Sequence, residues 1–121
     1  MGYSHEKSGS VEDVGELSEK GLSHYNDGDF EESNNIFERV ISLLENPPKS
    51  AEPWNLKGIA YHCLGCYYDA INCYDRALRF DDQFIGIHYN KSLTLRNMGK
   101  YFEALCSLNL YTLERPDDYV A

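Results

Sequence analysis

Apolar and small residues recur with a helical period through most of the chain, and glycine turns interrupt them. In the middle segment this period of about 3.6 residues is present on both sides of Gly65. The residues that carry it are Trp54, Gly58 and Tyr61 before the glycine and Ala70, Tyr74 and Ala77 after it. The pattern predicts two helices joined by a turn at Gly65, which is a helical hairpin over residues 51–81.

The same pattern returns before and after the middle segment. Gly28-Asp29-Phe30 and Gly99-Lys100-Tyr101 repeat the turn Gly65-Cys66-Tyr67, at separations of 37 and 34 residues. The longer separation is explained by the linker at Asn46-Pro47-Pro48, because proline cannot continue a helix. We therefore predict six helices, and we expect the second of them to continue to Glu45.

The middle segment resembles a tetratricopeptide repeat, a helix-turn-helix unit of about 34 residues. Large and small residues alternate as two closely crossing helices require, since Gly58 allows the approach and Tyr61 and Tyr74 fill the space beside it. The outer two segments match less well but are in register. The resemblance implies an all-α fold, in which three tetratricopeptide repeats with six helices stack as a right-handed superhelix.

These observations predict the organisation of the chain. We expect one domain over residues 11–118, with repeats at about 14–47, 51–84 and 85–118. Residues 1–10 are polar and lack a helical period, so we expect a flexible leader, and residues 119–121 form a C-terminal tail. Ser10 is predicted to cap the first helix and Ser50 the third.

The resemblance also implies a protein-protein interaction module, a scaffold or adaptor that binds a peptide or partner protein in a concave groove lined by the first helices. The residues expected in this groove are Leu22, Tyr25, Asn55, Ile59, His62, Tyr89, Asn90, Leu93 and Arg96. Such an aromatic, aliphatic and amide-rich surface suits an extended or helical peptide. The alternative for each residue is that it packs beneath a neighbouring helix.

Lysine occupies the same place in all three repeats, at Lys20, Lys57 and Lys91. The column is either a ridge that binds anions or a structural feature, in which the stems lie along apolar surface and the ammonium groups reach carboxylates. Its regularity favours the structural interpretation. The Lys-Gly pairs also resemble repeats that are abundant in archaea and bacteria, which implies a prokaryotic source.

Charge and composition exclude several classes of function. The 121 residues carry a net charge of −9, which would repel nucleic acid. No apolar run approaches the roughly 20 residues that span a bilayer, and residues 1–10 lack a signal-peptide core. The sequence also lacks a nucleophile motif, a phosphate loop and a metal-spaced motif. We expect a cytoplasmic protein that is not an enzyme and has no cofactor, metal, membrane or nucleic-acid partner.

Two cysteines supply an alternative function. Cys63 and Cys66, beside His62, have the spacing of half a zinc site or of a thiol-redox pair. The sequence has no second Cys-x-x-Cys motif to complete a tetrahedral site, and the pair spans a predicted turn. Ordinary structural roles explain both residues. A thiol-redox or zinc-dependent protein is therefore the second hypothesis, behind the interaction module.

The last predicted helix is apolar over an unusually wide arc, with one line at Cys106, Leu110 and Leu113 and another at Ala104, Leu108 and Tyr111. Exposure of such side chains forgoes about 1.5 kcal/mol or more for each of them. We therefore expect self-association, most simply as a homodimer, through Leu108, Leu110, Tyr111 and Leu113. The alternatives are that Tyr119 and Val120 cover this face or that the sequence is part of a longer array.

Overall fold

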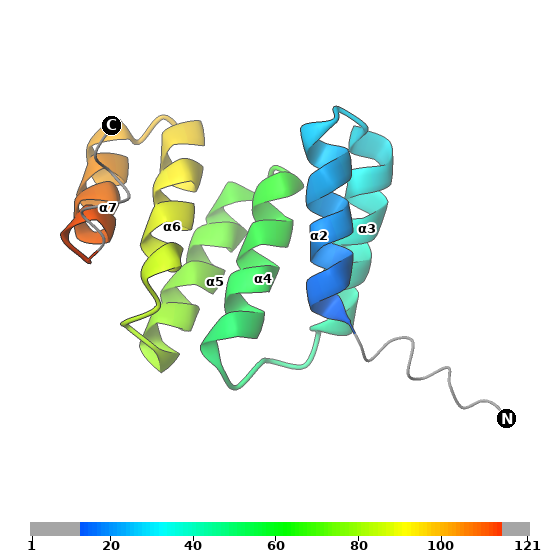
Figure 1. Ribbon diagram of the computed structural model, residues 1–121, viewed down its shortest axis with the longest axis horizontal. Helices are drawn as coiled ribbons and strands as arrows, with labels where there is room; N and C mark the ends of the chain where they lie inside the picture. The colour runs from blue at the N-terminus through cyan, green and yellow to red at the C-terminus, as the bar shows by residue number, and fades with distance from the viewer. Residues whose placement is uncertain (1–12, 115–121) are drawn as a thin grey trace, which may run out of the picture.

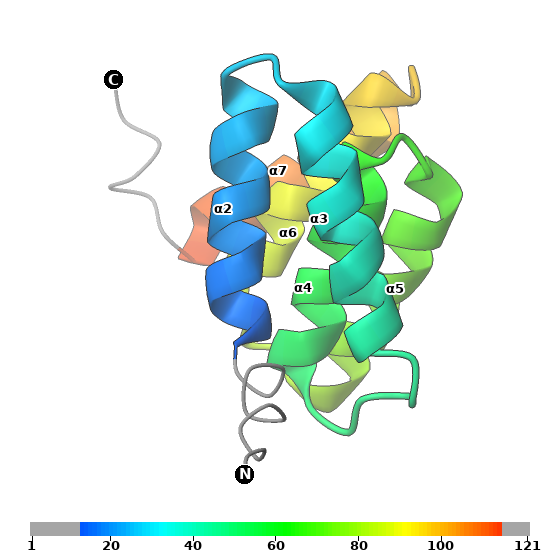
Figure 2. The same cartoon turned by 90° about the vertical axis from the view of Figure 1, so that its right-hand side faces the viewer.

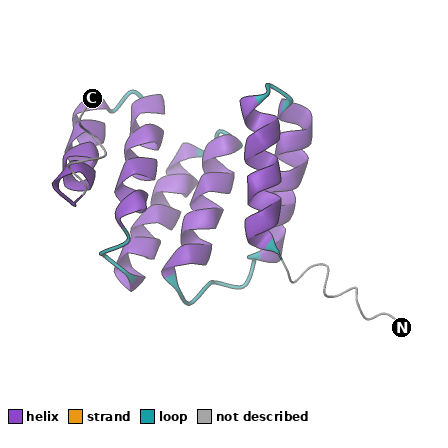
Figure 3. Ribbon diagram, viewed as in Figure 1, coloured by secondary structure: helices purple, strands orange, loops and turns teal. Residues whose placement is uncertain are grey.

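The computed structural model describes the backbone of residues 13–114 and the side chains of residues 13–110. This part of the chain contains six helices and no strand (Figure 3). They are α2 (Val14–Asn26), α3 (Phe30–Leu43), α4 (Ala51–Cys63), α5 (Tyr67–Phe80), α6 (Ile85–Asn97) and α7 (Tyr101–Glu114). None of these helices is long and apolar enough to cross a membrane.

Consecutive helices pair into three hairpins that stack along the longest axis of the molecule, with α2 and α3 at one end and α7 at the other (Figure 1). Viewed from the first end, α2 and α3 lie side by side in front of α4 and α5 (Figure 2). The predicted all-α fold of stacked helical hairpins is confirmed.

A glycine in the left-handed conformation closes each hairpin turn. The φ angle is 84° at Gly28, 85° at Gly65 and 83° at Gly99, where a residue with a side chain would be strained. The amide that follows each glycine donates a hydrogen bond to the carbonyl five residues before it, which caps the preceding helix. The three predicted turns are therefore confirmed, and they share one geometry.

The first and third helices begin differently from the prediction. Asp13, rather than Ser10, is the N-cap of α2, and its carboxylate accepts a hydrogen bond from the Glu16 backbone N–H at 3.3 Å. The prediction placed this cap too early because both side chains are good N-caps; Ser10 itself lies outside the described residues. Ser50 is the N-cap of α4 as predicted, but its side chain makes no capping hydrogen bond.

The second helix also ends earlier than predicted. α3 stops at Leu43 rather than Glu45, and the Leu44 backbone N–H donates to the carbonyls of both Val40 and Ile41 at 3.1 Å. Shared hydrogen bonds of this kind are common where an α-helix tightens at its end. The prolines that follow therefore mark the linker and not the last residue of the helix.

The core lies inside each hairpin and between neighbouring hairpins. One buried cluster surrounds Tyr74 and the other surrounds Phe37. A Cβ atom added at Gly58 would lie 2.5 Å from Tyr74 Cε1, and one at Gly21 would lie 2.8 Å from Phe37 Cζ. These contacts confirm that Gly58 permits the close crossing of its two helices.

Two of the three aligned lysines contact other side chains, Lys57 within α4 and Lys91 between two helices. Lys57 Nζ lies 5.2 Å from the centre of the Trp54 ring, and the Trp54 indole donates to the Pro48 carbonyl of the linker at 2.8 Å. Lys91 Nζ pairs with Asp75 Oδ1 at 2.7 Å and so joins α6 to α5. Lys20 is exposed. The contacts of Lys57 and Lys91 agree with the structural interpretation of the column.

Candidate functional site

The first helices of the hairpins, α2, α4 and α6, follow one another along one face, and α4 contacts both of the others (Figure 1). A cavity of about 240 Å³, here called the groove cavity, lies among them. Six of the nine predicted groove residues line it, namely Leu22, Tyr25, Ile59, His62, Asn90 and Leu93. Tyr74 of α5 also reaches this cavity. The structure thus brings together side chains from all three hairpins.

A hydrogen-bonded chain fixes the imidazole of His62 in this cavity. Thr94 Oγ1 donates to the Asn90 carbonyl at 3.2 Å, and His62 Nδ1 lies 2.7 Å from the same hydroxyl oxygen. With the hydroxyl proton directed to the Asn90 carbonyl, an imidazole that carries its proton on Nδ1 satisfies both contacts. The other ring nitrogen, Nε2, is then an acceptor, and Asn97 Nδ2 lies 3.5 Å from it.

The groove cavity is nearly uncharged. Burial lowers the pKa of His62 below its usual value of 6.5, and the nearby positive charge of Arg96 lowers it further. The neutral imidazole agrees with the hydrogen bonds described above. Among the nine predicted groove residues, Arg96 is then the one that carries a charge at pH 7. The concave face therefore differs from the rest of a chain whose net charge is −9.

The two predicted groove asparagines bond to each other across the helices. Asn90 Nδ2 donates to Asn55 Oδ1 at 3.0 Å, which links α6 to α4. Each amide keeps a further group for a ligand, because Asn90 Oδ1 can accept and Asn55 Nδ2 can donate. The pair therefore has a structural role. Asn90 lines the groove cavity and can still accept a hydrogen bond there, whereas Asn55 is not among the residues that line it.

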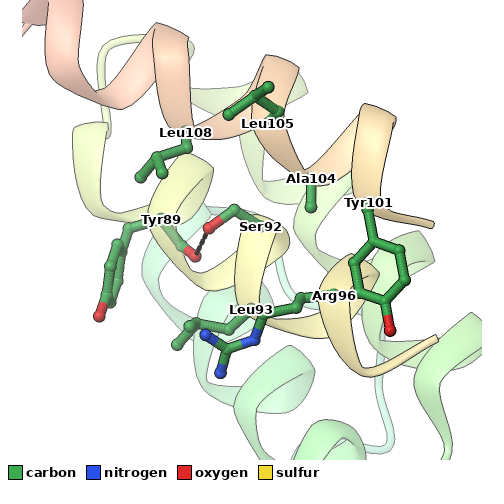
Figure 4. Close-up of a pocket in the computed structure, with 8 residues that line it drawn as sticks. All are labelled: Tyr89, Ser92, Leu93, Arg96, Tyr101, Ala104, Leu105 and Leu108. Carbon is green, nitrogen blue, oxygen red and sulfur yellow. Dashed lines mark hydrogen bonds between the residues drawn. The ribbon is translucent and has the colours of Figure 1, made fainter. Parts of the chain in front are cut away.

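The remaining predicted residues, Tyr89 and Arg96, lie together with Leu93 at a second cavity of about 410 Å³ between α6 and α7. We call this the end cavity (Figure 4). Its other lining residues are Ser92, Tyr101, Ala104, Leu105 and Leu108. Leu93 lines both cavities, so they are neighbours. Sequence reasoning missed Tyr101 and Leu105 as candidates, although their spacing of four residues on one helix indicates a shared face.

Of the four residues predicted to mediate self-association, the structure describes the side chains of Leu108 and Leu110, and these two have different surroundings. Leu108 is half-buried and lines the end cavity, whereas Leu110 is 48% exposed and is not among the residues that line it. Residues that are two positions apart on a helix point in different directions, because each residue turns the helix by about 100°. Tyr111 and Leu113 have side chains outside the described part of the chain.

The two cysteines of the pair have different surroundings. Cys63 is buried, and burial raises its pKa to about 12, whereas thiol nucleophiles and zinc ligands need a lowered pKa. Cys66 is an exposed free thiol in the turn after α4. Within residues 13–110, no group of three or more His, Cys, Asp or Glu side chains is placed to hold a metal ion.

Known proteins resemble this chain in sequence and in fold. The family model for the tetratricopeptide repeat matches residues 51–84. Superkiller complex protein 3 of Homo sapiens is 34% identical over 81 residues, which are 67% of this chain and 5% of that protein. The chain therefore spans a small part of this relative's length. The prokaryotic source that the Lys-Gly pairs indicate stays a prediction.

Two solved structures show the same fold at low sequence identity. The Arabidopsis OM64 TPR domain superposes with a TM-score of 0.61 at 18% identity, covering 89% of this chain and 87% of that one. The Yersinia enterocolitica type III secretion chaperone SycD, solved with a peptide of the translocator YopD, gives 0.52 at 19% identity, with coverage of 82% and 73%. The helical hairpins, their close crossings and these matches agree. The chain is a tetratricopeptide repeat protein.

Proposed function

We propose that this protein is a non-catalytic interaction module that binds a peptide, or an exposed segment of a partner protein, in the groove cavity. The observation that carries the proposal is the convergence of six side chains from three hairpins on one cavity. The peptide bound to SycD, a protein of the same fold, supports it. The net charge of −9 supports a protein partner over a nucleic acid.

The lining of the groove cavity suits an apolar side chain on a peptide backbone. Leu22, Ile59 and Leu93 supply apolar walls. Tyr25 is held by an edge-on contact with Phe30, whose ring centre lies 5.5 Å away, so it is a rigid anchor that loses little entropy on binding. The free acceptor of Asn90, which lines the cavity, matches a backbone N–H of an extended peptide.

A peptide selection tests this proposal. A random peptide display library is selected on the full chain, and a labelled winner is measured by fluorescence anisotropy. We expect Leu22→Ala and Ile59→Ala to weaken binding by about tenfold each, a loss of about 1.4 kcal/mol. Tyr68→Ala, an exposed position on α5 that does not line the cavity, is the matched control and should bind as the native chain does.

The proposal fails if the groove variants, shown to be folded by circular dichroism, bind the selected peptides with native affinity. It also fails if Tyr68→Ala weakens binding as much as they do. Either result would place the ligand on another face of the protein.

Self-association through α7 is a second candidate function. Phe102 and Leu110 are large apolar side chains that are exposed on this helix and do not line the end cavity. Burial of such a surface between two copies is favourable. Light scattering across a concentration series should show a dimer for the native chain and a monomer for Leu110→Glu. A native chain that is monomeric at tens of micromolar would exclude this function.

A further inference from the structure

The repeated architecture provides a template for the end cavity. Each residue that lines it has a counterpart 34 residues earlier in the middle hairpin. The counterparts of Tyr89, Ser92, Leu93, Arg96, Tyr101, Ala104, Leu105 and Leu108 are Asn55, Gly58, Ile59, His62, Tyr67, Ala70, Ile71 and Tyr74. The element that packs against these counterparts in the middle hairpin therefore indicates what kind of element fits the end cavity.

A helix, α6, lies against the counterpart surface. It contacts both α4 and α5, and it bonds to Asn55 through Asn90 at 3.0 Å and to His62 through Thr94 at 2.7 Å. Its Ile87 is fully buried in the cluster around Tyr74. The end cavity thus has the form of a surface on which a helix packs in this same protein.

Exposure along α7 marks out the extent of that surface. Leu105 is 53% exposed, whereas its counterpart Ile71 is half-buried against the core cluster that includes Ile87 of α6. Phe102 is 79% exposed, but its counterpart Tyr68 is 72% exposed even with α6 in place. A helix docked at the end cavity is therefore expected to cover Leu105 and to leave Phe102 in water.

The charge at the end cavity distinguishes its ligand from α6. Arg96 stands where the middle hairpin has His62, which forms a hydrogen bond with the hydroxyl of Thr94. A guanidinium only donates hydrogen bonds and pairs best with a carboxylate. Within residues 13–110 the ion pairs are His24 with Asp29 and Lys91 with Asp75, so Arg96 has no carboxylate partner there.

We propose that the end cavity binds an amphipathic helix of a partner protein that carries an acidic residue facing Arg96. By the template of α6, an apolar side chain of the partner takes the place of Ile87 and packs on Ala104 and Leu108. Its carboxylate takes the place of Thr94, seven residues further along the helix. The partner is recognised by an apolar residue followed, two helical turns later, by Asp or Glu on the same face.

A second copy of this chain is a poor source of that helix. In the same register α2 presents Glu16, Glu19 and Ser23 at the places of Ile87, Asn90 and Thr94, and all three are exposed. Head-to-tail stacking would bury the Glu16 carboxylate at the place of the fully buried Ile87, and it would set Ser23, not a carboxylate, opposite Arg96. The geometry therefore favours a different protein.

The sequence of α6 itself provides the probe. A labelled peptide of residues 84–98 with Thr94→Glu is titrated with the full chain by fluorescence anisotropy, beside the same peptide with Thr94→Lys. We expect the Glu peptide to bind at least tenfold more tightly. Arg96→Glu in the protein should reverse this preference, which distinguishes the end cavity from the α6 site beside His62.

Two further variants locate the binding surface. Leu105→Glu should abolish binding of the Glu peptide, while Phe102→Glu, its matched control on the same helix, should retain native affinity. Leu22→Ala should also retain it, because Leu22 lines the groove cavity and not the end cavity. This last result separates a failure here from a failure of the groove proposal.

Three outcomes would overturn the inference. The Glu peptide could fail to bind the native chain, or the charge reversal at Arg96 could leave the preference unchanged. A native dimer, seen by light scattering, that dissociates with Leu105→Glu would show that a second copy occupies the end cavity.

Discussion

The middle and last hairpins have the same arrangement of helices but differ in how much of it is covered. Leu105 and Tyr101 in the last hairpin are 53% and 69% exposed, whereas their counterparts Ile71 and Tyr67 in the middle hairpin are half-buried. The middle hairpin packs against α3 on one side and α6 on the other. The comparison teaches that a repeat is apolar on two sides, so its burial depends on its neighbours as much as on itself.

The two hairpins also cross their helices in different ways. No side chain fits at Gly58, because a Cβ atom added there would lie 2.5 Å from the Tyr74 ring. Ser92 stands at the same place in the last hairpin opposite the smaller Leu108, and its hydroxyl donates to the Tyr89 carbonyl at 2.7 Å (Figure 4). The middle crossing is therefore filled by an aromatic ring, while the last one leaves space for the end cavity.

The largest difference between the hairpins should follow from removal of their corresponding core side chains. Tyr74→Ala is expected to lower the free energy of unfolding by about 3–5 kcal/mol, because it leaves a cavity in the closed core. Leu108→Ala should cost about 1 kcal/mol, because this side chain is only half-buried. Urea unfolding of both variants measures the contrast, and equal losses would contradict it.

A smaller contrast is expected at the crossing points. Gly58→Ala should destabilise the protein by about 1–3 kcal/mol, because the new methyl group forces the Tyr74 ring to move. Ser92 already has a Cβ at this place, so Ser92→Ala adds no atom and should cost about 1 kcal/mol or less. The measurement is again urea unfolding. A Gly58→Ala protein as stable as the native chain would mean that the helices separate freely.

The pH dependence of stability should distinguish His62 from its counterpart Arg96. The pKa of His62 is lowered in the folded state, so the unfolded chain binds this proton more readily. The stability that neutral His62 provides is therefore present above pH 6.5. The free energy of unfolding falls as the pH drops below this value. The slope is at most about 1.4 kcal/mol per pH unit, the limit for one proton.

This prediction is checked by urea unfolding at pH 7.5 and at pH 5.5. His62→Gln should lose less stability than the native chain between the two values, because glutamine does not titrate. If the native chain and the variant change by the same amount, the folded structure does not disfavour the protonated imidazole.

The smallest effect is expected at the ion pair that joins the two hairpins. Lys91→Met removes the contact with Asp75 and should cost about 0.2–1 kcal/mol at low salt, and less at high salt. Lys20→Met, at the equivalent exposed place in the first repeat, is the control and should be neutral. A loss for Lys91→Met that does not depend on salt would show that its stem, and not its charge, supports the interface.

Most of the helical architecture could be predicted, but the ends of the helices were harder. Ser10 and Asp13 are both suitable N-caps, and no local rule favours the second over the first. The end of α3 is set by the bonds of Leu44 to Val40 and Ile41, not by the prolines after it. Helix termini depend on a few weak hydrogen bonds that compete closely, so sequence reasoning places them only approximately.

The helices that carry the candidate site could be predicted, but the division of its residues between two cavities could not. The register of the repeats placed all nine groove residues on the first helices, because residues at equivalent places in a repeat face the same side. The register did not show that these residues line two cavities, the groove cavity and the end cavity, which share Leu93. It also joined Leu108 with Leu110, although the first lines the end cavity and the second does not.

The sequence by itself determined the six helices, their three glycine turns and the close crossing at Gly58. These features depend on local periodicity, on the backbone freedom of glycine and on side-chain size, all of which are written in neighbouring residues. The tertiary structure alone decided that Asn55 bonds to Asn90 and His62 to Thr94. Such pairs join residues more than thirty positions apart, so they form only when the packing of one hairpin on the next sets the distance between their helices.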